Sequence, residues 1–149
     1  MDVIEFFDSD RPEHWLDRIG HSDWRGGRYL YELLRDHRLK ALYGERAKVL
    51  LLTDGDALLS FCTYAERDDI SDPSLTPWVG FVYTFPTRRG QRLFGRLLSE
   101  AERLGREDGF DALYISTSHI GLYEKYGCEF YATMTDVEGG LSRVYRKRL

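Results

Sequence analysis

Residues 86–98 form a basic, glycine-containing segment between an apolar, strand-like run (78–85) and a helix-like pattern. The residue types that could bind an anion there are three arginines and two glycines: Arg88, Arg89, Arg92, Gly90 and Gly95. The first turn of a helix leaves four backbone N–H groups without intrahelical partners and carries the positive end of the helix dipole. Glycine lets the backbone approach a ligand closely. This junction therefore suits a pyrophosphate, although a solvated basic turn can have the same spacing.

The segments that follow the basic turn have the order of a known enzyme superfamily. They are a long amphipathic helix, a strand-like run (112–117) and the sequence Gly-Leu-Tyr-Glu-Lys-Tyr-Gly-Cys-Glu-Phe over residues 121–130. Together they resemble the GCN5-related N-acetyltransferase (GNAT) superfamily over roughly residues 47–149, most specifically over 78–130. The turn departs from the family pattern, because Arg92 and Phe94 stand where glycines are usual and Gly95 comes one place late.

The resemblance implies one GNAT-like domain over residues 1–149 of the α/β (α+β) class. Its mixed, mostly antiparallel central sheet is flanked by helices, and its two central strands splay apart to admit the acyl-pantetheine arm of acetyl-CoA. Acetyl-CoA is the expected co-substrate, and no metal is expected. The implied cofactor-binding residues lie on the first central strand, in the turn, on the second central strand and just beyond it: Phe81, Val82, Tyr83, Arg88, Arg89, Gly90, Gln91, Arg92, Leu93, Phe94, Gly95, Ser116 and Tyr123.

Tyr123 is the expected catalytic acid. Acyl transfer to an amine needs a neutral nucleophile, stabilisation of a developing oxyanion and a proton for the leaving thiolate. Tyr123 stands where the resemblance places the tyrosine that donates this proton to the coenzyme A sulfur, and a phenol can do so. The alternative is that Tyr123 packs on the sheet together with Leu122 and Tyr126.

Acidic residues at the end of a strand-like run are the expected acceptor site. Glu66, Asp68 and Asp69 could attract a cationic amine and relay its proton. Glu66 is the expected catalytic base, with Asp69 or water as alternatives, and Glu66, Asp69 and Trp78 are the expected substrate-binding residues. A solvated acidic loop is the competing interpretation.

The predicted function is therefore an acetyl-CoA-dependent N-acetyltransferase that acts on a primary amine of a small molecule. A non-catalytic acyl-CoA-binding or sensing module with the same fold is the alternative. A nucleotide-binding P-loop protein is a poor third candidate, because the pattern Gly-x-x-x-x-Gly-Lys-Ser/Thr is absent.

Composition limits the other partners. The 149 residues carry a net charge of −4, which argues against nonspecific nucleic-acid binding. No apolar stretch reaches the roughly 20 residues that a membrane span needs, and the first residues lack the pattern of a signal peptide. We expect a cytoplasmic protein without a nucleic-acid or membrane partner, for which a homodimer stays open. Two cysteines and four scattered histidines lack metal-ligand spacing.

Periodicity predicts the remaining elements. Residues 11–19 and 28–42 have helical spacing, and Asp54-Gly55-Asp56 predicts a hairpin turn between strands 47–53 and 57–64. Gly109 suits the end of the long helix. Two further strands are expected near 130–136 and 142–148, the last of them as an edge strand protected by its Arg and Lys residues.

Overall fold

The computed structural model describes all residues, 1–149. The elements in chain order are β1 (Asp2–Glu5), η1 (Phe6–Asp8), α1 (Pro12–Gly20), α2 (Arg25–Arg35), α3 (Leu39–Tyr43), β2 (Lys48–Asp54), β3 (Ala57–Ala65), β4 (Trp78–Thr84), η2 (Pro86–Arg88), α4 (Phe94–Glu107), β5 (Ala112–Thr117), η3 (Tyr123–Tyr126), β6 (Glu129–Thr135) and β7 (Leu141–Arg148). The longest helix, α4, has 14 residues, and none of the helices is long and apolar enough to cross a membrane.

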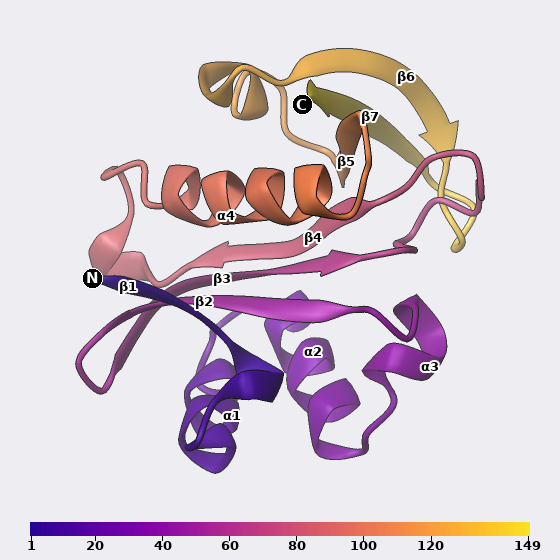
Figure 1. Ribbon diagram of the computed structural model, residues 1–149. Coiled ribbons are helices and arrows are strands. Elements are labelled where there is room, and N and C mark those ends of the chain that lie inside the picture. The colour runs from indigo at the N-terminus through magenta and orange to yellow at the C-terminus, as the bar shows by residue number, and fades with distance from the viewer.

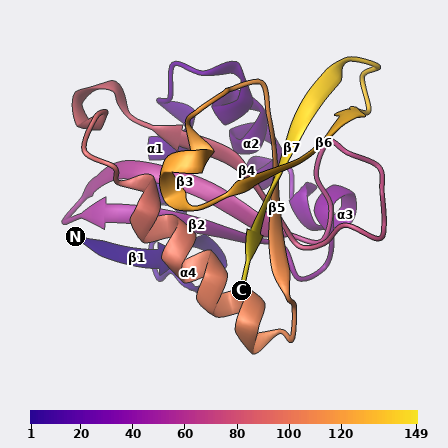
Figure 2. The same cartoon turned by 90° about the horizontal axis from the view of Figure 1, so that it is seen from above.

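The strands form one seven-stranded sheet in the order β1-β2-β3-β4-β5-β7-β6. Only β4 and β5 are parallel, and they pair at a single position, Trp78 with Tyr114. Figure 1 shows α1, α2 and α3 on one face of β1–β4 and α4 on the other, and Figure 2 shows β5 and β7 at a steep angle to β2 and β3. The expected mixed, mostly antiparallel sheet with splayed central strands is thus confirmed.

Two apolar cores hold these layers together. The core between the sheet and α4 has 16 buried residues, among them Leu97, Ala101 and Ile115. The core between the sheet and α1–α3 has 14, among them Ile19, Leu30 and Phe61. Burying one such side chain stabilises the folded state by about 1.5–3 kcal/mol. Because β2 and β3 are buried on both faces, they form a firm support for β4, which pairs with β3.

A bulge in β4 is the local feature that matters most for the site. Phe61 pairs with Tyr83 and Thr63 with Gly80, so that one residue of β3 faces two residues of β4, Phe81 and Val82. Phe81 has a φ of 49°, in the left-handed region. The extra residue lets Phe81 pack on the α1–α3 side of the sheet while Val82 packs on the α4 side.

Two sequence-based expectations need correction, and one strand was missed. Residues 28–42 form two helices, because His37 takes a φ of 56° and the Arg38 N–H closes back on the Leu33 carbonyl at 2.8 Å, which ends α2. β1, which pairs with β2 at the sheet edge, was not predicted. β7 lies between β5 and β6 and is not an edge strand; two of its arginines pair with Glu129 of β6.

The other local predictions are confirmed. The Asp54-Gly55-Asp56 turn joins β2 to β3, with Gly55 at a φ of 60°. Gly109, at a φ of 85°, follows the end of α4. Both glycines adopt the left-handed conformation, which glycine reaches at little steric cost.

Candidate active site

The basic turn presents a row of free backbone N–H groups. Residues 89–93 connect η2 to α4, and Gly90 has a φ of 81° with nothing within 4 Å of where a Cβ would lie. The N–H groups of residues 90–93 donate no hydrogen bond within the chain, whereas the next turn is closed by bonds such as that from the Arg96 N–H to the Leu93 carbonyl at 3.0 Å. Consecutive free N–H groups beside a helix N-terminus form an anion-binding concavity.

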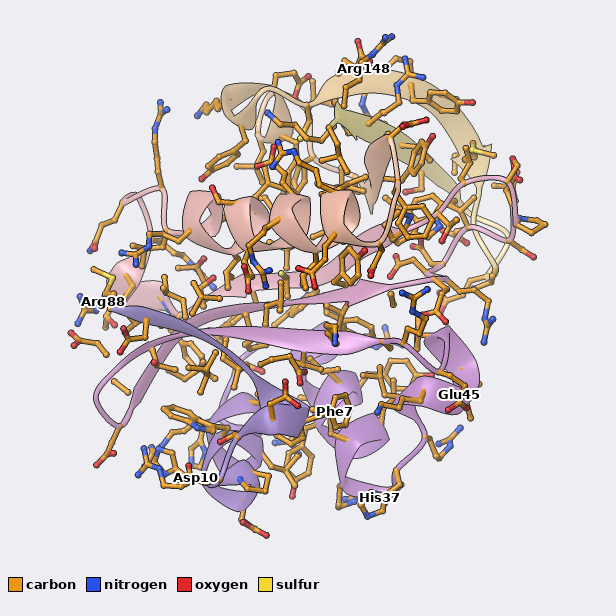
Figure 3. All side chains as sticks on the ribbon, viewed as in Figure 1. Phe7, Asp10, His37, Glu45, Arg88 and Arg148 are labelled. Atoms are coloured by element: carbon orange, nitrogen blue, oxygen red, sulfur yellow. The ribbon has the colours of Figure 1, made fainter.

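The three arginines of the turn differ in how free they are. Arg88 lies 3.9 Å from Asp54, and Figure 3 shows it at the end of the molecule where α4 begins. Arg89 donates to the Thr84 carbonyl at 2.9 Å and covers the Tyr83 ring at 5.4 Å. Arg92 is exposed and makes no ion pair. Arg92 is thus the cation of the turn that is most available to an incoming anion.

The two positions that depart from the family pattern behave differently. Arg92 has a φ of 55°, so it keeps the left-handed conformation that glycine adopts at low cost. Phe94 is buried, and the edges and faces of its ring meet Tyr123 and Tyr126 with centroid distances of 5.6 and 5.3 Å. The backbone of the turn is therefore left-handed at Arg92, while Phe94 joins the start of α4 to η3.

Tyr123, on η3, is 4% exposed and belongs to the core under α4. Burial raises the pKa of its phenol, with smaller contributions from nearby groups that include Cys62 and Asp68. No hydrogen bond from the chain contributes to this shift. The ring of Tyr123 therefore packs in the core, and its hydroxyl has no hydrogen-bond partner within the protein.

The hydroxyl of Ser116, on β5, is hydrogen-bonded within the protein and is not free for a ligand between β4 and β5. Its hydroxyl lies 2.6 Å from that of Ser142, which also donates to the Thr117 carbonyl at 3.3 Å. The pair ties β5 to β7, so Ser116 could reach a ligand only by exchanging this bond.

The acidic loop after β3 is fixed in place from several sides. The Arg67 N–H donates to the Tyr43 carbonyl at 3.0 Å, and its guanidinium donates to the Leu42 carbonyl at 3.1 Å. On the opposite side, the Val137 N–H donates to the Asp69 carbonyl at 2.8 Å. These bonds hold Asp68 and Asp69 between α3 and the hairpin of β6 and β7.

Asp68 and Asp69 form a pair of half-buried carboxylates beside β4. Asp68 lies so close over Gly80 that a Cβ at that position would overlap its carboxylate oxygen. Burial and the neighbouring Asp69 charge raise the pKa of Asp68 to about 7. Asp69 Oδ1 is buried and has no hydrogen-bond partner. The pair therefore offers a proton acceptor that is effective near neutral pH and an unsatisfied oxygen next to it.

Tyr43 lies beside this carboxylate pair and belongs to a cluster of three aromatic rings. Phe81, turned by the bulge, contacts Tyr43 and Tyr29 with centroid distances of 5.6 and 6.2 Å. Burial raises the pKa of Tyr43, and the charges of Asp68 and Asp69 contribute to the shift. Carboxylates beside aromatic faces form a site suited to a cationic amine.

Two of the expected acceptor residues lie elsewhere. Glu66 packs its carboxylate against Gly44 and accepts from the Arg46 N–H at 3.3 Å. Trp78 is 1% exposed, and its indole N–H donates to the Leu75 carbonyl at 2.6 Å. Trp78 is a core residue with no surface for a ligand. The Glu66 carboxylate accepts a hydrogen bond from the segment that connects α3 to β2.

Sequence reasoning missed Tyr29, Tyr43 and Gly80, and it named Asp68 only as one of three acidic residues of the loop, without a role of its own. The only local signal was the Asp68-Asp69 doublet, because the rings and the glycine come together through tertiary contacts. No three His, Cys, Asp or Glu side chains gather in a geometry that could hold a metal ion.

Comparison with known proteins places this geometry in a family. The aminoglycoside 6'-N-acetyltransferase from Enterococcus faecium aligns with a TM-score of 0.67 and 13% identity, over 99% of this chain and 97% of that one. An aminoglycoside 6'-N-acetyltransferase complexed with coenzyme A gives 0.68 and 15%, over 99% and 97%. The ribosomal-protein-alanine N-acetyltransferase from Brucella melitensis gives 0.63 and 15%, over the full length of both chains.

A comparison with curated protein sequences gives no match. These structural similarities, at such identities, establish the fold. The sequence model described as acetyltransferase (GNAT) domain matches residues 31–131, which is more than half of the chain. The chain therefore belongs to the GNAT acetyltransferase family.

Proposed function

We propose that this protein transfers an acetyl group from acetyl-CoA directly to the primary amine of a small cationic molecule. The observation that carries the proposal is the Asp68–Asp69 pair beside the β4 bulge, with Asp69 Oδ1 buried and unpartnered. A buried carboxylate oxygen without a donor costs about 1–3 kcal/mol or more. The N–H groups of an ammonium supply such donors.

The acceptor end of the proposed site recognises charge and shape together. Asp69 binds the ammonium, and the faces of Tyr29, Tyr43 and Phe81 contribute cation–π attraction. Because Arg67 and Val137 hold the loop on both sides, the carboxylates are positioned before the amine arrives.

Asp68 is the proposed general base. An ammonium has no lone pair with which to attack, so it must first lose a proton. The raised pKa of Asp68 lets its carboxylate accept that proton near neutral pH. The freed lone pair then forms the new C–N bond at the acetyl carbonyl carbon, and the nitrogen releases its second proton to solvent before the C–S bond breaks.

Tyr123 is the proposed general acid. Its hydroxyl has no partner in the chain, and its raised pKa keeps it protonated at neutral pH. Tyr123 donates this proton to the sulfur as the C–S bond breaks, and solvent reprotonates the phenol.

The free N–H groups of residues 90–93 and the side chain of Arg92 are proposed to hold the pyrophosphate of acetyl-CoA. The fit rests on the open space at Gly90 and on the unpaired row of donors. The coenzyme A complex of a structurally similar acetyltransferase supports this choice of co-substrate.

The test is a screen of small amines with acetyl-CoA, read by mass spectrometry of the amines and by release of the coenzyme A thiol. The proposal predicts acetylated products among cationic primary amines and none among their neutral hydroxyl analogues. Tight acetyl-CoA binding without any amine-dependent thiol release would instead support the acyl-CoA-binding module.

A further inference from the structure

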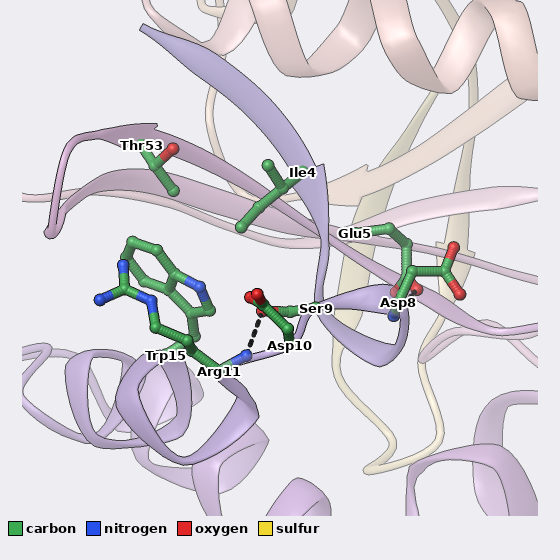
Figure 4. Close-up of a pocket in the computed structure, with 8 residues that line it drawn as sticks. All are labelled: Ile4, Glu5, Asp8, Ser9, Asp10, Arg11, Trp15 and Thr53. Carbon is green, nitrogen blue, oxygen red and sulfur yellow. Dashed lines mark hydrogen bonds between the residues drawn. The ribbon is translucent and has the colours of Figure 1, made fainter.

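A cavity lies away from the proposed active site. It has a volume of about 550 Å³ and opens between β1, the segment after it and the first turn of α1 (Figure 4). In the sheet, β2 and β3 separate β1 from β4, a distance of roughly 14 Å at the usual strand spacing of about 4.8 Å. The size is that of a small-molecule site.

Trp15 supplies an unused hydrogen-bond donor to this cavity. The side chain is 3% exposed, and its indole N–H has no acceptor in the chain, unlike that of Trp78, which donates to the Leu75 carbonyl at 2.6 Å. In Figure 4 the indole nitrogen lies on the ring edge that faces Ser9 and Asp10. This unpartnered donor at the cavity wall favours a ligand that brings an acceptor.

Two carboxylates at the cavity are also unused. Asp8 and Asp10 line it, and neither side chain has an ion-pair or hydrogen-bond partner within the chain. Their neighbours are engaged, because Glu5 accepts from the Asp8 and Val49 N–H groups at 3.1 and 3.0 Å. Arg11 pairs with Asp56 at 2.9 Å. The cavity therefore has a negative balance that its own arginine does not neutralise.

We propose that this cavity binds a hydroxylated primary amine, such as an amino sugar or amino alcohol. Its ammonium pairs with the Asp10 carboxylate, a hydroxyl oxygen accepts from the Trp15 N–H, and its carbon frame contacts Ile4. The Asp10 carboxylate and the Trp15 N–H line the same small space (Figure 4), so a ligand needs both an ammonium and an oxygen acceptor to satisfy them. This binding site is independent of acetyl transfer.

The experiment uses the full chain labelled with ¹⁵N and follows the indole N–H resonances of its three tryptophans after resonance assignment. Glucosamine is the probe, and glucose and cyclohexylamine are the controls that carry only the hydroxyls or only the charge. We expect a saturable shift of the Trp15 resonance with glucosamine. Each control binds about ten-fold more weakly, because each loses one class of contact.

Variants separate this cavity from the acceptor site. Asp10→Asn should weaken glucosamine binding about ten-fold, whereas Asp111→Asn, an exposed aspartate before β5, should leave it unchanged. Asp69→Asn should also leave the Trp15 shift unchanged. The proposal is overturned if glucosamine leaves the Trp15 resonance in place, if Asp10→Asn binds as the wild type does, or if Asp69→Asn abolishes the shift.

Discussion

The two ends of the proposed active site are built from different chemical groups, backbone N–H groups at one end and side chains at the other. The cofactor end is a backbone structure, in which the N–H groups of residues 90–93 are free and the side chains around them are mostly exposed. The acceptor end is a side-chain structure, in which Asp68, Asp69 and aromatic rings meet across four separate segments. A backbone site tolerates replaced side chains but not a blocked backbone, and a side-chain site behaves in the opposite way.

The largest expected effect is at the acceptor end. Asp68→Asn removes the proposed base while it keeps the size of the side chain over Gly80, so kcat should fall by about 10²–10⁴-fold. The measurement is steady-state kinetics at saturating acetyl-CoA. Glu66→Gln is the matched control, because that carboxylate is engaged with the Arg46 N–H. A larger loss of kcat in Glu66→Gln than in Asp68→Asn would contradict the assignment.

Tyr123→Phe tests the proposed general acid, which packs in the core under α4. The hydroxyl makes no bond in the chain, so unfolding midpoints should not change, while kcat falls by about 10²-fold when chemistry limits the rate. Tyr126→Phe, on the same short helix, serves as the control and should keep its rate. Unchanged turnover in Tyr123→Phe would reduce Tyr123 to a packing residue.

Gly90→Glu tests the backbone end. Its side chain adds a negative charge beside the free N–H groups, so acetyl-CoA affinity measured by calorimetry should fall more than ten-fold, about the loss of one charged contact. Gly90→Ala shares the strain of a φ of 81° without the charge and should lose less affinity. Equal losses in the two variants would show that strain, and not access to the anion, dominates.

The pH dependence separates catalysis from stability at Asp68. With a pKa of about 7, kcat/KM should rise through neutral pH as the base loses its proton, and Asp68→Asn should lose this rise. Because the folded carboxyl titrates above its ordinary value of 3.8, the folded state binds more protons than the unfolded state between these values. The stability contribution is therefore present at low pH and is lost as pH rises through about 7.

Denaturant unfolding of wild type and Asp68→Asn at several pH values measures that loss. Above neutral pH the variant should be the more stable protein, since it carries no buried charge there. A wild type that gains stability relative to Asp68→Asn as pH rises would mean that a cation pairs with Asp68 in the folded state.

Arg92→Gly should give the smallest effect. Glycine fits the φ of 55° that Arg92 adopts, so the backbone path should persist and stability should change by at most about 1 kcal/mol. Loss of one exposed cation should weaken acetyl-CoA binding a few-fold at low salt and less at high salt, because screening shortens the reach of surface charges. An effect as large as that of Gly90→Glu would mean that the side chain of Arg92, and not the backbone, holds the anion.

The same contrast explains what the sequence could predict. The cofactor turn was predictable because its parts are local: Gly90, the arginines and the start of α4 lie within ten residues. The acceptor end was predicted only as an acidic loop. Neither the packing of Glu66 on Gly44 nor that of Asp68 on Gly80 can be read from spacing, since each contact joins segments far apart in the chain.

The sheet shows a similar division. The β2–β3 hairpin and β5 have local patterns and were predicted, whereas β1 is a four-residue edge strand whose pairing with β2 is its main support. The break between α2 and α3 was missed because His37, and not a glycine, takes the left-handed conformation.

The most direct test of the account is the dependence of thiol release on both substrates in two variants. For an amine identified in the screen, Gly90→Glu should raise the KM for acetyl-CoA and leave that for the amine unchanged, and Asp69→Asn should do the reverse. That pattern would establish two separately built ends that serve one acetyl transfer. If Asp69→Asn raised both KM values equally, or if no amine released thiol from acetyl-CoA, the account would be contradicted.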